Sequence, residues 1–224
     1  MRNKYFTLKQ ILPNIFLLNF NNAYDLGMMF LRYQEFYESP SKKIRGKSMS
    51  ILRLMEWYAR YSKKNIFTYP EDFAGDNFPG ENILKVFEAG IPDYNFYDLL
   101  MKNVYEHCAS YSNKFYIVAT IGKKSNFPKW WKDKPQDIIK HEVAHALFYL
   151  NKEYKKEMVS LINNLPKRYK TKIKIALKKL GYAKTVYTDE MQAYLSCGIH
   201  TSFGKIPKEI TSAFSKTYKK YCKI

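Results

Sequence analysis

The sequence predicts a helix-rich α+β fold, and three observations lead to this prediction. Residues 114–121 form a short run of aromatic and β-branched residues that ends at Gly122, which is typical of a buried strand. Several segments on either side of this run carry apolar residues at helical spacing. Apolar residues make up 46% of the 224 residues and aromatic residues 17%, so the chain has enough apolar surface for a substantial core.

The segment before the strand is predicted to be mostly helical. Apolar spacing predicts helices at residues 20–38, 49–61 and 94–109. Residues 66–80 are rich in turn residues and aromatic residues, and we interpret them as an ordered loop. The apolar stretch 11–20 contains Pro13 and Asn14 and is too short to cross a bilayer. We therefore interpret it as part of the fold rather than as a secretory signal or a membrane span.

The segment after the strand begins with a strong helix at residues 137–151. Its apolar residues fall on one stripe about 100° wide, and these are Ile139, Val143, Ala146, Leu147 and Leu150. Such a stripe needs a partner surface, so we expect the helix to pack against the strand at 114–121. Further helices are predicted at residues 153–165, at 167–180, from Thr188 as an N-cap, and at 207–222. We expect residues 1–112 and 113–224 to be two subdomains of one compact unit.

The charge of the chain is strongly positive but its pattern is unspecific. Lys and Arg number 38 against 20 Asp and Glu, a formal net charge of +18, and only six of the basic residues are Arg. Proteins that recognise specific nucleic-acid sequences favour the planar Arg side chain, so the Lys excess predicts only nonspecific attraction to polyanions.

The three cysteines, Cys108, Cys197 and Cys222, form no CxxC pair, and we expect reduced thiols in a cytoplasmic protein.

The helix at 137–151 carries a motif with a specific chemistry. His141-Glu142-Val143-Ala144-His145 matches HExxH, in which two His about 40° apart around the helix axis present their imidazoles to one metal ion. Glu142 lies beside them, where it can act as a general base without binding the ion. The alternative is a pair of partly buried structural histidines whose hydrogen-bond partners are neighbouring side chains.

This motif, on a helix that follows a strand, resembles the zincin metallopeptidases over about residues 114–197. The resemblance implies Zn²⁺ as the cofactor, a peptide or protein as the substrate, and an active-site helix packed on a small sheet. It also implies that the strand at 114–121 is the sheet edge along which an extended substrate pairs. The metzincin pattern of Gly and His soon after the motif is missing, so the resemblance is to gluzincins, in which a Glu on a downstream helix is the third ligand.

Glu190 is the predicted third ligand. It lies in the first turn of the helix that follows Thr188, and the small Ala193 one turn later allows a close approach to the active-site helix. Asp189 is the second choice for this role. The alternative for both is an acidic first turn that complements the helix dipole.

The residue that stabilises an oxyanion is less defined by the sequence. Tyr194 and His200 are the candidates, and Tyr187 is also close to the Glu190 helix. His107 lies outside the motif, and we interpret it as structural.

The sequence therefore predicts a zinc-dependent metallohydrolase, and specifically a peptidase that uses water activated by Glu142. One alternative is a noncatalytic interaction protein, such as a basic nucleic-acid binder, with a structural metal site. The presence of Glu142 argues against it, because a structural site needs no base beside the metal. Another alternative is a metal hydrolase that acts on a bond other than a peptide bond.

Overall fold

The computed structural model describes residues 1–123, 126, 134–198 and 201–223, and it confirms the helix-rich α+β class. Its strands are β1 (Phe6–Leu12), β2 (Ile15–Phe20), β3 (Gly75–Pro79) and β4 (Tyr116–Ile121). Its longer helices are α1 (Ala23–Glu38), α2 (Ile51–Tyr61), α4 (Glu81–Glu88), α5 (Phe96–Ala109), α6 (Pro135–Leu150), α7 (Lys152–Asn163), α8 (Lys167–Lys179), α9 (Tyr187–Cys197) and α10 (Lys208–Tyr221). Short helical turns are α3 (Tyr69–Asp72), η2 (Lys184–Val186) and η3 (Thr201–Phe203).

The strands form one mixed sheet in the order β1-β2-β4-β3. β2 and β4 are parallel, whereas the β1–β2 and β3–β4 pairs are antiparallel. All six residues of β4 are buried, as expected for a strand with both faces covered. β4 thus lies inside the sheet, and the prediction that residues 114–121 form its edge is wrong. The sheet joins strands from both sides of residue 112.

The edge beside β4 is instead β3, within the segment predicted to be a loop. Residues 66–80 contain α3 as well as this strand, so the loop prediction is wrong there. Gly75, Asp76, Asn77 and Pro79 all belong to residue types that are rare in strands. Pairing with β4 forms this strand despite its composition, and such long-range pairing leaves no local signal in the sequence.

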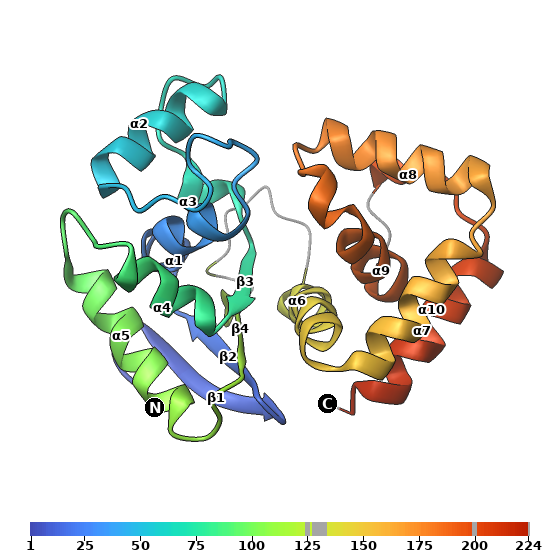
Figure 1. Cartoon of the computed structure of the whole chain (residues 1–224), viewed down its shortest axis with the longest axis horizontal. Helices are drawn as coiled ribbons and strands as arrows, with labels where there is room; N and C mark the ends of the chain where they lie inside the picture. The colour runs from blue at the N-terminus through green and yellow to red at the C-terminus, as the bar shows by residue number, and fades with distance from the viewer. Residues whose placement is uncertain (124–125, 127–133, 199–200, 224) are drawn as a thin grey trace.

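Two apolar cores lie on opposite faces of the sheet. Alternate residues of β2 and β4 face opposite sides, so Leu17 and Val118 join one core while Leu18 and Ile117 join the other. α1, α4 and α5 contribute to the core that holds Leu18. α6 and the C-terminal helices α7 to α10 contribute to the core that holds Leu17. Figure 1 shows α6 between the sheet and this C-terminal group of helices.

α6 packs against β4 and β3, which confirms the predicted contact between this helix and the strand at 114–121. The sequence predicted a single buried stripe, but residues 142–148 are all buried. The reason is that α9 packs against α6 on the side away from the sheet. Polar residues on that side are therefore enclosed between two helices.

α9 begins two residues before the position predicted from the sequence. Tyr187 is its first residue, Val186 is the N-cap residue, and no side chain caps the helix. The expected N-cap role of Thr188 is therefore wrong, although Asp189 and Glu190 do lie in the first turn. Across the described residues, none of the helices combines the length and the apolar character needed to cross a membrane.

Candidate metal centre

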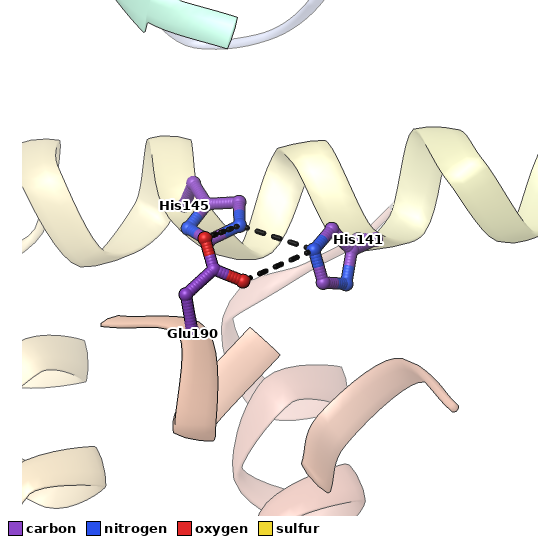
Figure 2. A group of neighbouring side chains, drawn as sticks. All are labelled: His141, His145 and Glu190. Carbon is purple, nitrogen blue, oxygen red and sulfur yellow. Dashed lines mark hydrogen bonds and ion pairs between the residues drawn. The ribbon is translucent and has the colours of Figure 1, made fainter. Parts of the chain in front are cut away.

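Two helices bring the predicted ligand atoms together. The Nε2 atoms of His141 and His145, one turn apart on α6, lie 3.2 Å from each other. Glu190 on α9 points its carboxylate at both rings, at 3.8 Å from His141 Nε2 and 3.8 Å from His145 Nε2 (Figure 2). One ligand atom from each residue lies within 4.8 Å of the others. Glu190 is thus placed as the sequence predicted.

The surroundings of Glu190 show that these residues fit a cation. Its side chain is only 6% exposed, and its Oε2 atom has no hydrogen-bond partner among the described residues. A buried carboxylate oxygen without a donor is costly, and a cation between the three side chains would remove that cost. Two imidazole nitrogens and one carboxylate oxygen also form a donor set that divalent metals accept.

Asp189 contacts the cluster from its outer side. Its Oδ1 atom lies 2.9 Å from His145 Nδ1, whereas the other ring nitrogen, Nε2, pairs with Glu190. When Nδ1 donates its proton to Asp189, the lone pair of Nε2 is free to bind a metal. Asp189, the second choice for the third ligand, therefore contacts the candidate ligand His145 instead of joining the cluster.

Asp189 is itself held by a buried chain of hydrogen bonds. Gln192 Nε2 donates to Asp189 Oδ1 at 2.9 Å, and the Tyr154 hydroxyl donates to Gln192 Oε1 at 2.6 Å. Gln192 and Tyr154 are both fully buried. This chain connects α7 and α9 to the metal-binding face of α6. Neither residue stands out in the sequence as part of a site.

The charges in the cluster act strongly on one another. Burial alone would lower the pKa of His145, but the carboxylates of Asp189 and Glu190 outweigh it and raise that pKa well above its usual range. Burial and the nearby charge of His145 lower the pKa of His141. Burial raises the pKa of Glu190 to about 8, although His145 opposes this effect. A bound cation would favour the ionised form of Glu190 and release the proton from His145.

Glu142 lies on the sheet side of the same helix and is held by β3. Asn77 Nδ2 donates to Glu142 Oε2 at 2.5 Å, and the Tyr116 hydroxyl donates to Asn77 Oδ1 at 2.5 Å. Burial raises the pKa of Glu142, while the charge of His145 and the hydrogen bond from Asn77 oppose the change. Asn77 was missed by the sequence analysis because β3 itself was missed.

Gly75 sets the distance between β3 and α6. A Cβ atom at this position would lie 2.6 Å from Ile138 Cγ2 and 2.9 Å from Glu142 Oε1. Contacts this short do not occur between real side chains. The absence of a side chain at Gly75 therefore allows the edge strand to lie directly against Glu142.

A cavity of about 550 Å³ opens beside the cluster, and we call it the metal-site cavity. His141, Glu142, Gly75, Tyr182 and Tyr194 are among the residues that line it. The Tyr194 ring centroid lies 4.5 Å from that of His141, and the Tyr194 and Tyr182 hydroxyls are 3.0 Å apart.

The remaining sequence candidates have different positions. Tyr187 is not among the described residues that line the metal-site cavity, whereas Tyr182, which the sequence analysis did not select, is among them. His200 lies outside the described residues. His107 is in the last turn of α5, where its ring contacts that of Tyr111 at 5.4 Å.

Comparison with known proteins assigns neither a family nor a function to the chain. No protein-family model, curated protein sequence or solved structure matches the chain. The similarity to gluzincins therefore rests on the HExxH motif and on the position of Glu190 in the fold.

Proposed function

We propose that the chain is a zinc-dependent peptidase in which His141, His145 and Glu190 hold the metal. The observation that carries this proposal is the meeting of the three ligand atoms next to a cavity that His141 and Glu142 line. Zinc sites in hydrolases commonly use three protein ligands and leave one position open, and two His with one Glu form such a set. When bound, zinc would lower the pKa of a coordinated water towards about 7 and polarise the carbonyl group of the substrate.

Glu142 acts as the general base in this proposal. It follows His141 directly but points to the sheet side of α6, where Asn77 orients its carboxylate. That carboxylate can take a proton from the attacking water and pass it to the leaving amine. A structural metal site has no use for a buried carboxylate held in this position.

The proposed role of Tyr194 is to donate a hydrogen bond to the oxyanion that develops in the transition state. Its ring contacts the His141 ring in a tilted arrangement and lines the metal-site cavity. The adjacent Tyr182 hydroxyl orients it. A donor aimed at developing charge contributes more to the rate than to substrate binding.

β3 provides a binding surface for an extended peptide. Among the described residues this strand pairs only with β4, so its other edge can accept the backbone of a substrate. Gly75, the first residue of the strand, and the preceding Ala74 line the metal-site cavity together with Glu142. A peptide paired with this edge would cross the cavity beside the metal ligands, which favours a peptide bond as the target.

Two variants separate metal binding from hydrolysis. Glu142→Gln keeps the size of the side chain and removes the base, so we expect it to retain zinc and lose most activity on a quenched fluorescent peptide library. His145→Ala removes a ligand, so we expect it to lose both zinc and activity. Near-normal hydrolysis by Glu142→Gln at full zinc occupancy would refute the mechanism.

A further inference from the structure

A second cavity adjoins the metal-site cavity. Its volume is about 250 Å³, and it lies between α1, α2 and α3 on one side and the segment after α8 on the other. Phe73 and Tyr182 line both cavities. The two cavities are therefore neighbours on either side of these two side chains. We call the second cavity the aromatic pocket.

One wall of the aromatic pocket consists of aromatic rings. Trp57, Tyr58 and Tyr61 come from α2, and Tyr69 comes from α3. Trp57 stacks on Tyr61 with a centroid distance of 5.1 Å, and Tyr58 contacts Tyr69 edge-on at 4.9 Å. Aromatic ring faces attract cations, and the attraction grows when the cation is shielded from water.

Three polar atoms of the pocket lack a hydrogen-bond partner. Glu35 Oε2, Gln34 Oε1 and the Tyr69 hydroxyl are buried and have no hydrogen-bond partner among the described residues. Gln34 Nε2 already donates to Glu38 Oε1 at 2.5 Å, so its carbonyl oxygen is the atom left over. Two of the three atoms can only accept hydrogen bonds and the hydroxyl can accept one. The group that would satisfy them is one rich in N–H donors.

The acidic groups of the pocket have no basic residue beside them among its described lining. Glu35 and Glu38 line it, and no Lys, Arg or His is among its described lining residues, although the whole chain has a net charge of +18. Burial raises the pKa of Glu35 to about 7 and that of Glu38 to about 7. Glu35 is buried, Glu38 is half-buried, and the charge of His145 opposes only the shift of Glu38. A guest with a positive charge would therefore lower the cost of the buried Glu35 carboxylate.

We propose that the aromatic pocket binds the cationic side chain of an Arg or Lys residue in the substrate. The carboxylate of Glu35 and the acceptors of Gln34 and Tyr69 would take the N–H donors, and the rings of α2 would pack against the alkyl chain and the charged group. The identification of the guest as part of a substrate rests on the proposed peptidase function. The affinity of the pocket for a cationic group does not depend on that function.

Calorimetric titration with N-acetyl-arginine methylamide tests the pocket directly. The matched probe is the citrulline analogue, which has nearly the same shape and no charge. We expect the arginine probe to bind at least about tenfold more tightly, because a buried charge-assisted hydrogen bond is stronger than a neutral one. Glu35→Gln should remove this difference. Glu56→Gln, which makes the same charge change on an exposed part of α2 outside the pocket, should retain it.

The outcomes separate this proposal from the peptidase function. Equal binding of the two probes, or a difference that persists in Glu35→Gln, would overturn the pocket assignment even if peptides are cleaved. Selective binding of the arginine probe by a chain that cleaves no peptide would support the pocket and count against the peptidase. If Glu35→Gln does not fold, Trp57→Leu serves as the second variant. Unchanged binding of the arginine probe after this loss of an aromatic wall would contradict the proposal.

Discussion

His145 Nδ1 lies 2.9 Å from the carboxylate of Asp189, the residue immediately before Glu190. The first turn of α9 thus contacts one proposed ligand through Asp189 and supplies another proposed ligand with Glu190. Metal-binding His residues commonly donate their second ring N–H to a carboxylate in this way, which fixes the tautomer and strengthens the ligand. The pair of acidic residues therefore has two different roles.

The roles of Asp189 and Glu190 are separable by metal affinity. Asp189→Asn should weaken metal binding by about 10–100-fold, because the orienting partner of His145 loses its charge. Glu190→Gln should weaken it further, because a ligand is lost. Competition against a chelator measures both, and Glu209→Gln in the exposed first turn of α10 is the control. A larger loss in Asp189→Asn than in Glu190→Gln would show that the roles are reversed.

Gly75→Ala should impair both stability and activity. The added methyl group would lie 2.6 Å from Ile138 Cγ2 and 2.9 Å from Glu142 Oε1, so β3 must move away from α6. We expect a loss of about 1–3 kcal/mol in the free energy of unfolding, together with a lower kcat/KM. Gly122→Ala is the control, since its nearest contact would be 3.3 Å from Asn19 Cβ. Equal effects of the two substitutions in thermal unfolding would argue against the close approach at Gly75.

Tyr194→Phe should lower kcat by about 10²-fold or more with little change in KM. The substitution keeps the ring against His141 and removes only the hydroxyl that is proposed to contact the oxyanion. Tyr187→Phe, on the same helix but not among the residues that line the metal-site cavity, should leave both constants unchanged. Steady-state kinetics on one cleaved peptide would decide. A rise in KM at constant kcat would assign Tyr194 to substrate binding instead.

The buried Glu35 predicts a specific dependence of stability on pH. Its pKa is raised from 4.5 to about 7 in the folded chain, so between these values the folded state holds a proton that the unfolded state has released. Stability therefore falls as pH rises from about 5 to 8, and Glu35 contributes up to about 3 kcal/mol to this fall. Chemical denaturation without ligand should show that the free energy of unfolding of Glu35→Gln, relative to that of the unmodified chain, increases as pH rises over this range. A difference independent of pH would contradict the raised pKa.

The sequence was most informative where the site depends on local geometry. His141, Glu142 and His145 lie within two turns of one helix, so their spacing alone places them on neighbouring faces. Glu190 was found because an acidic first turn with a small residue nearby is visible in a single segment. Its packing against α6 still depends on the intervening helices α7 and α8, whose arrangement the sequence does not specify.

Most of the contacts that the sequence did not predict join distant segments. Asn77 reaches Glu142 only because β3 pairs with β4, and its strand has a composition that favours turns. Gln192 and Tyr154 form a pair between two helices and have no distinctive spacing. Side-chain orientation around a ligand is set by tertiary packing, which a pattern in one segment does not report.

The most direct test of the account is a zinc-soaked crystal measured on both sides of the zinc absorption edge. We predict one anomalous peak at about 2.0–2.2 Å from His141 Nε2, His145 Nε2 and a carboxylate oxygen of Glu190. Glu142 should lie close by without coordinating, and Asp189 should contact only His145. A peak coordinated by Asp189 or Glu142 in place of Glu190, or no peak at the histidines under saturating zinc, would contradict the proposed metal centre.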